Sequence, residues 1–132
     1  MNARQKKKQE GSEPLVLPIK RKWFDMIRKG IKLEDYREIK PYYDTRLMNA
    51  FGSILVNGQI MHGKDVPEEI RKEWPVPVIF RNGYGGNSPQ ITAFCNLKMG
   101  NGKTEWGAEP GKKYYILEIE GIAERRQQQC RD

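Results

Sequence analysis

The sequence predicts one mixed α/β domain of the α+β kind, a small β-barrel with one or two flanking helices. Its 132 residues suit a single domain and leave little room for a second. Several segments alternate apolar and polar residues, as half-buried strands do, and turn signals separate them. Strands with turn signals and few helices favour a barrel over a doubly wound sheet.

A short strand and a helix are the first elements expected. The apolar run LVL at residues 15–17 opens the domain. A helix should follow over residues 20–29, because Trp23, Phe24 and Ile27 are spaced so that they share one face. A glycine comes directly after this segment, as at many helix ends. The helical spacing fully explains the tryptophan, which we assign to the core.

An extended segment and a second, short helix are expected next. Residues 32–39 read as an extended segment that Pro41 closes, and this proline also disfavours helix in the residue before it. Residues 42–50 are expected to form the short helix.

We interpret the stretch 51–75 as an insertion that decorates the barrel. An Asn-Gly pair within it, at residues 57–58, predicts a turn between two apolar segments. A helix is expected over residues 67–74, with Asp65 and Glu68 spaced as a capping box ahead of it.

Three clearer strand signals follow the insertion. Residues 76–80 alternate apolar and polar ahead of an Asn-Gly pair, and residues 91–99 alternate up to a Gly-Asn-Gly sequence. Residues 115–119 present an apolar face, and Glu118 lies on the other face of that strand. These three segments should supply most of the sheet.

Charge is concentrated in the first third of the chain. The formal net charge is +7; residues 14–40 hold eight basic against four acidic side chains, and residues 1–13 four against two. We expect residues 1–13 to be a disordered basic leader, residues 14–123 to form the domain and residues 124–132 to be a polar tail. A localised basic surface attracts phosphate by counterion release, but a charge run can equally be a solvated face.

The composition also limits location and cofactors. No apolar run approaches the roughly 20 residues that cross a bilayer, and the polar N-terminal segment has no secretory h-region, so we expect a cytoplasmic protein without a membrane partner. Cys95 in an apolar segment and Cys130 in the polar tail do not make a disulfide framework. With His62 as the single histidine and no C-x-x-C, we expect no zinc site and no cofactor.

The sequence GIKLEDYR, between the first helix and the extended segment, carries the strongest functional signal. On a strand, Asp35 and Arg37 share one face and could pair, while Glu34 and Tyr36 point to the other. In a partly enclosed basic cleft the pKa of Lys32 would fall, and the lysine could act as a base. Held less tightly, it would contact phosphate. The simpler alternative is an Asp35–Arg37 pair that fixes the strand, with Lys32 exposed.

The glycine-rich segment RNGYGG at residues 81–86 is a second candidate. Its glycines permit a tight turn whose backbone N–H groups suit an anion. Arg81 could meet a phosphate, and Tyr84 could stack on a base. Asn82 and the glycine after it also favour a plain hairpin turn of type I′.

The loop WGAEPG at residues 106–111 is a third candidate. Trp106 could serve as a stacking platform, and Glu109 could accept a hydrogen bond from a base edge. Trp106 could equally cover one end of the barrel as part of the core.

Together these segments resemble the ASCH family of the PUA-like superfamily. The sequence GIKLEDYR is similar to the family signature Gly-x-Lys-x-x-Glu-x-Arg, with Asp35 where the family usually has glutamate. Residues 17–47, 80–85 and 105–115 are similar to family segments and follow in the family's order. The resemblance covers residues 15–122 apart from the insertion. It implies a PUA-like barrel that handles RNA or modified nucleosides.

The resemblance also bears on catalysis. One ASCH branch is similar to amidohydrolases that remove the acetyl group from N4-acetylcytidine, with the motif lysine and a threonine, and a ribonuclease activity is reported for another branch. Lys32 matches the lysine, whereas Asp35 stands at the threonine position. The branch's catalytic glutamate has no mapped counterpart in this chain. The resemblance therefore implies binding more directly than it implies chemistry.

The leading hypothesis is an RNA- or nucleotide-binding domain with a basic cleft. The residues expected to line the cleft are Lys20, Lys32, Asp35 and Arg37 from the front of the chain, with Arg81, Asn82 and Tyr84 opposite them. The alternative is a hydrolase of a modified cytidine or of RNA, with Lys32 as catalytic base. A third possibility is a protein-interaction module whose basic patch meets an acidic partner. The sequence leaves the oligomeric state open.

Overall fold

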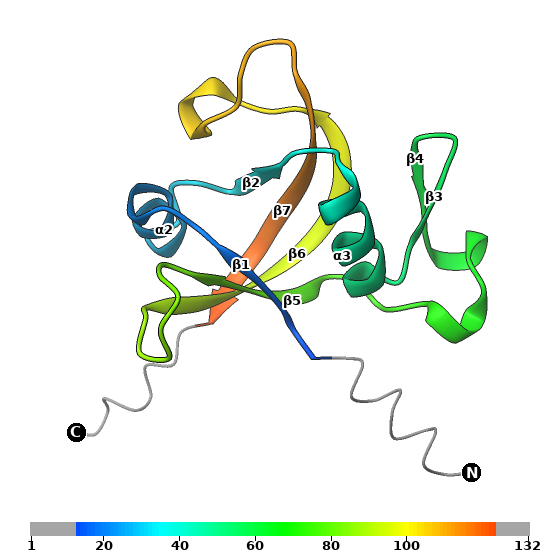
Figure 1. The fold of residues 1–132 in the computed structure, drawn as a ribbon, viewed down its shortest axis with the longest axis horizontal. Helices are drawn as coiled ribbons and strands as arrows, with labels where there is room; N and C mark the ends of the chain where they lie inside the picture. Colours follow the sequence, from blue (N-terminus) through cyan, green and yellow to red (C-terminus); the bar gives the residue numbers. More distant parts are fainter. Residues whose placement is uncertain (1–12, 124–132) are drawn as a thin grey trace, which may run out of the picture.

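A computed structural model of the protein describes residues 13–123, so residues 1–12 of the expected leader and the whole expected tail lie outside the described residues. Five strands form one sheet that curls into a half barrel, with two helices beside it (Figure 1). The strands are β1 (Leu15–Pro18), β2 (Glu34–Arg37), β5 (Val76–Arg81), β6 (Gln90–Asn101) and β7 (Lys113–Ala123). Their order is β1-β5-β6-β7-β2. The β1–β5 pair is parallel, and the other pairs in this sheet are antiparallel. A sheet with two helices beside it confirms the mixed α/β class.

The concave face of the sheet forms the core, and the expected alternation produces it. Ile91, Ala93 and Cys95 of β6 are buried, each two residues from the next, as the strand period requires. A register shift at Phe94 and Cys95 marks a bulge against β7, which increases the local twist and curls the sheet. The first part of the outer face of β7 is buried too, because Tyr114 and Ile116 pack in a second apolar cluster there, whereas Glu118 and Glu120 farther along this face are not buried. The alternation of 115–119 did not predict this second cluster.

The expected first helix is confirmed as α2 (Arg21–Arg28). Phe24 and Ile27 are buried against the sheet, as their spacing predicts, and Trp23 is half-buried at the edge of the core. Gly30 has a φ of 77°, so it allows the left-handed turn that ends the helix.

The second helix, α3 (Pro41–Phe51), is one residue longer at each end than expected. Pro41 is the first residue of α3, a position where proline is favourable because its missing N–H has no partner within the helix. Leu47 and Phe51 are fully buried, so α3 packs on the core through this side. Phe51 therefore belongs to the core, and the decorating segment begins after it.

The decorating segment holds a hairpin of β3 (Ile54–Val56) and β4 (Gln59–Met61). Asn57 and Gly58 have φ angles of 53° and 75°, which confirms a turn at this Asn-Gly pair. Within residues 13–123, no helix has the length and apolar content needed to cross a bilayer.

The helix expected over residues 67–74 is wrong. Only a 3-10 turn forms there, at Glu68–Ile70, and no side chain caps it. The segment EEIRKEW offers a single aliphatic residue to bury, and the proline after Trp74 disfavours helix in that tryptophan. Trp74 instead donates from its indole N–H to the Phe51 carbonyl at 2.9 Å, which ties the segment to the end of α3. Two further 3-10 turns lie at Gly63–Asp65 and Thr104–Trp106.

Candidate nucleic-acid interface

A charge cluster lies inside the domain at the start of β2. The side chains of Lys32, Asp35 and Arg37 are 2%, 6% and 11% exposed. Arg37 donates from Nε to Asp35 Oδ2 at 2.7 Å, while Lys32 Nζ lies 3.8 Å from Asp35 Oδ1. The expected Asp35–Arg37 pair is therefore confirmed, and it shares its carboxylate with the lysine.

Lys32 is a buried cation rather than an exposed one. Its ammonium donates to the Glu34 carbonyl and lies 5.4 Å from the ring centroid of Trp23 and 5.1 Å from that of Tyr36. Burial lowers the pKa of Lys32, and the nearby Asp35 carboxylate opposes that shift. The sequence left Lys32 either in a partly enclosed cleft with a lowered pKa or exposed to solvent. The structure agrees with the lowered pKa, but it places the lysine under two aromatic rings, where it contacts protein groups.

Arg37 extends from the cluster toward the surface. Its Nη2 donates to the Pro18 carbonyl at 3.0 Å, and its Nη1 lies 3.4 Å from the Tyr43 hydroxyl. Burial alone would lower the pKa of Arg37, but the Asp35 carboxylate raises it above its ordinary value. The guanidinium therefore stays charged and links the interior to the edge of β1.

A hollow of about 340 Å³ adjoins that edge. Its lining residues come from the end of β1 and from the β5–β6 loop: Pro18, Ile19, Lys20, Asn82, Gly83 and Tyr84. Asn82 donates from Nδ2 to the Ile19 carbonyl at 3.0 Å, which holds the loop against the end of β1. Tyr84 is 90% exposed. The hollow thus brings together three residues that the sequence predicted for one cleft.

The β5–β6 loop is longer than the type I′ hairpin turn expected at Asn82. Strand β5 ends at Arg81 and β6 begins at Gln90, and Ser88 accepts a hydrogen bond at 3.0 Å from the Gly85 N–H. The glycine run permits this wider loop in place of the tight turn. Arg81 donates from Nε to the Gln90 side chain at 2.9 Å and does not line the hollow.

The third candidate loop lies apart from the hollow. Trp106 is half-buried in a 3-10 turn, and Lys103 Nζ lies 5.1 Å from its ring centroid. Glu109 is exposed, and its backbone N–H donates to the Tyr114 hydroxyl at 3.0 Å. Neither Trp106 nor Glu109 lines the hollow beside β1.

A second aromatic and basic group lies at the start of α3, and sequence reasoning missed it. Arg46 Cζ lies 3.8 Å from the ring centroid of Tyr42, which meets Tyr43 edge to face at 5.0 Å. Lys40 Nζ lies 5.7 Å from the Tyr43 ring centroid. We call these four residues the α3 surface. Its signal in the sequence is the pair of tyrosines in KPYYDTR, which helical spacing brings beside the arginine.

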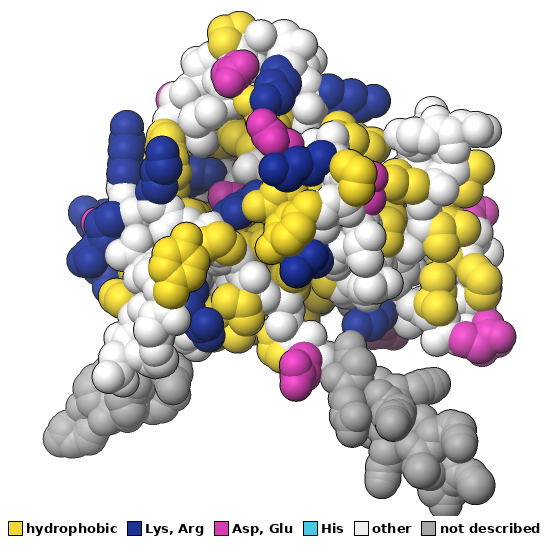
Figure 2. Space-filling model, in the orientation of Figure 1, with side chains coloured by type: hydrophobic (Ala, Val, Ile, Leu, Met, Phe, Trp, Pro, Cys, Tyr) yellow, Lys and Arg dark blue, Asp and Glu magenta, His cyan; other side chains and the backbone are white. Residues whose placement is uncertain are grey.

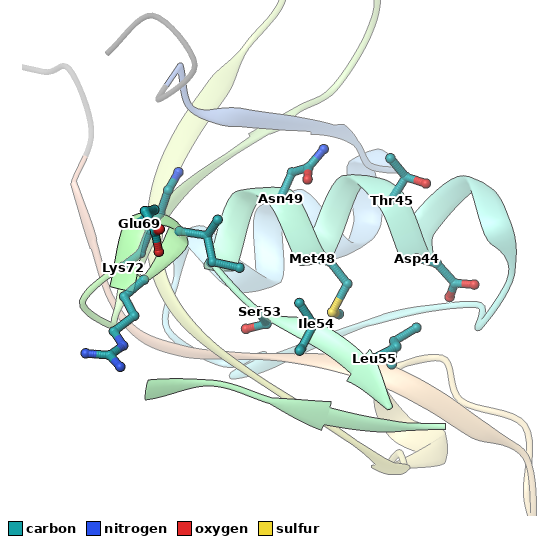
Figure 3. A pocket seen from close by; sticks show the side chains of 12 residues that line it. Asp44, Thr45, Met48, Asn49, Ser53, Ile54, Leu55, Glu69 and Lys72 are labelled. Atoms are coloured by element: carbon teal, nitrogen blue, oxygen red, sulfur yellow. The ribbon is translucent and has the colours of Figure 1, made fainter. Parts of the chain in front are cut away.

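Another hollow, of about 750 Å³, lies between α3, β3 and residues 69–72. Figure 3 shows Met48 directed from α3 toward Ile54 and Leu55 of β3. None of the residues predicted for the cleft lines it. Among the residues that the structure describes, no three histidine, cysteine or acidic side chains gather as a metal site.

Comparison with known proteins adds no relative. No protein-family model matches the chain, and no similar protein was found among curated proteins or solved structures. The residues around the hollow and the α3 surface are therefore the basis for assigning a function.

Proposed function

We propose that this protein is an RNA-binding domain of the ASCH type, in which a nucleotide chain lies over the hollow between β1 and the β5–β6 loop. The observation that carries the proposal is the convergence of Lys20, Asn82 and Tyr84 on that hollow. An exposed lysine contacts phosphate, and an exposed tyrosine gives a base a face to stack on. The resemblance of GIKLEDYR to the ASCH signature supports the same function.

The charge around the hollow favours an anionic partner. Helix α2 begins directly after Lys20, and its first turn adds the exposed side chains of Arg21 and Lys22. Figure 2 shows dark blue basic side chains interleaved with yellow hydrophobic ones, and a few magenta acidic ones, on the face that carries β1 and the start of α3; Tyr42 and Tyr84 are among its exposed aromatic residues. Such interleaving of cations with aromatic rings is typical of surfaces that bind single-stranded nucleic acid.

Binding is a better proposal than hydrolysis because of the position of Lys32. A catalytic base must come within hydrogen-bond reach of the proton that it takes. The Lys32 ammonium is buried, it pairs with Asp35, and the hollow beside β1 does not include it. In this account Lys32 holds the Asp35 carboxylate in place, and the carboxylate in turn holds Arg37.

The test is fluorescence anisotropy of a labelled single-stranded RNA with the full chain, repeated over a salt series. Lys20→Ala should reduce the slope of log binding constant against log salt concentration by about 0.7, because one phosphate contact is lost. Tyr84→Ala should weaken binding by about 1–3 kcal/mol, whereas Tyr84→Phe, which keeps the ring, should not. Lys64→Ala, an exposed lysine in the decorating segment, is the matched control. Equal effects of Lys20→Ala and Lys64→Ala would refute the proposed site.

A further inference from the structure

Tyr42 and Arg46 form an exposed stacked pair on α3. The guanidinium carbon lies 3.8 Å from the tyrosine ring centroid, and Tyr42 remains 51% exposed. A planar guanidinium on an aromatic ring offers its outer face to a base and its N–H groups to phosphate. The two residues are four apart on one helix, so the pair also contributes a few tenths of a kcal/mol to α3 itself. A test of a binding role must therefore separate ligand affinity from helix stability.

Arg37 connects this pair to the hollow beside β1. Pro18 lines the hollow and accepts a hydrogen bond at 3.0 Å from Arg37, which also reaches to within 3.4 Å of the Tyr43 hydroxyl. Tyr43 in turn touches Tyr42 edge to face. A continuous line of contacts therefore runs from the hollow to the α3 surface.

The acidic groups along this line have partners of their own. Glu38 lies 3.4 Å from Lys40 Nζ and 3.2 Å from Lys112 Nζ, and these lysines lower the pKa of its carboxyl. Asp44 accepts a hydrogen bond at 2.5 Å from the Tyr115 hydroxyl. Arg46 adds an exposed positive charge at the end of the line. Asp44 keeps its negative charge, so the suitability of this surface for a chain of phosphates rests on the cations Lys20, Arg37 and Arg46 along it.

We infer that the ligand is a single strand of RNA, long enough for one base to stack at Tyr84 and another at the Tyr42–Arg46 pair. This inference rests on the proposed function and adds to it the class of ligand. A mononucleotide would occupy only one of the two stacking points. The bases of a duplex are stacked on one another and are not available to either point.

The experiment compares three labelled ligands on the full chain: an oligouridylate of about twelve nucleotides, a uridine dinucleotide and an RNA duplex about twelve base pairs long. Tyr42→Ala should weaken binding of the oligouridylate by about five- to tenfold, the loss of one stacked base. It should leave dinucleotide binding unchanged, and Tyr42→Phe should restore the oligouridylate affinity. Asn49→Ala, an exposed residue of the same helix, is the matched control, and thermal melting of each variant shows whether α3 is intact.

The outcomes separate this inference from the proposed function. If Lys20→Ala and Tyr84→Ala weaken oligouridylate binding but Tyr42→Ala changes it less than twofold, the second stacking point is refuted and the site beside β1 stands. A duplex that binds as tightly as the single strand also refutes the inference. If the oligouridylate does not bind, or if Lys20→Ala and Tyr84→Ala have no effect, the proposed function fails and this inference fails with it.

Discussion

The guanidinium of Arg37 donates to the carbonyl of Pro18 at 3.0 Å, and this contact joins the two edge strands of the sheet. Strands β1 and β2 lie at opposite ends of the order β1-β5-β6-β7-β2, so no backbone ladder connects them. The same guanidinium is held by Asp35 at 2.7 Å. A side-chain bridge thus spans the open side of the half barrel, directly beside the hollow at β1.

Arg37→Ala should destabilise the domain by about 3–5 kcal/mol, because it breaks a buried ion pair and leaves the Asp35 carboxylate with a more distant cation. Arg21→Ala is the matched control: Arg21 pairs with Asp25 at 3.1 Å on the surface, and its side chain is 62% exposed. That change should cost less than about 1 kcal/mol. Urea unfolding of both variants checks the prediction, and equal losses would contradict it.

Lys32→Met should change how stability depends on pH. Burial lowers the pKa of Lys32 below its ordinary value of 10.5, so the unfolded chain binds more protons than the folded chain between these two pKa values. The Lys32 contribution to the free energy of unfolding therefore rises with pH up to about 10.5. Relative to Lys32→Met, the parent protein should gain stability as the pH rises through this window.

Lys98→Met supplies a control of opposite sign. The hydrogen bond with Glu118, at 2.8 Å, raises the pKa of Lys98, so its contribution is present below pH 10.5 and is lost as the pH rises further. Urea unfolding of the three proteins between about pH 8 and pH 11 measures both effects. If the free energy of unfolding of the parent and of Lys32→Met changes with pH in the same way, Lys32 titrates alike in the folded and unfolded chains and the prediction is wrong.

Gly52→Ala should destabilise the domain more than Gly58→Ala. Both glycines have positive φ, 62° and 75°, so each substitution carries a backbone cost of about 1 kcal/mol or more. A Cβ at Gly52 would also overlap the Ile70 carbonyl oxygen and lie 2.7 Å from the Lys72 backbone nitrogen, whereas a Cβ at Gly58 would face open space. The added overlap should cost a further 1–3 kcal/mol or so. The melting temperatures of the two variants test this prediction. Equal decreases in melting temperature would contradict it and would mean that the segment after the 3-10 turn at Glu68–Ile70 moves away from the added Cβ at little cost.

The elements that the sequence predicted well are those whose local pattern matches their packing. Phe24 and Ile27 share a helical face, and that face is buried; Ile91 and Ala93 alternate, and their side of β6 is buried. Residues 67–74 failed because the segment has charge and helical length but almost no apolar surface to bury, so tertiary packing did not stabilise a helix.

The site was harder to predict, because depth and partners depend on the tertiary structure. Strand alternation placed Asp35 and Arg37 on one face, but it could not show that Trp23 and Tyr36 would cover Lys32. Nor does any local pattern bring Arg37 to Pro18, nineteen positions earlier in the chain. Such contacts follow from the order of strands in the sheet, which periodicity does not encode.

The most direct test of the central claim is chemical-shift mapping of the full chain by NMR with a single-stranded oligouridylate. We predict that backbone amide shifts will change at residues 19–20, 82–84 and 37–46, and that those of the hairpin at residues 54–61 will not. Saturation of these shifts at one common affinity would show that the hollow and the α3 surface bind one ligand. Shifts confined to the hairpin, or scattered over all faces of the domain, would contradict the account.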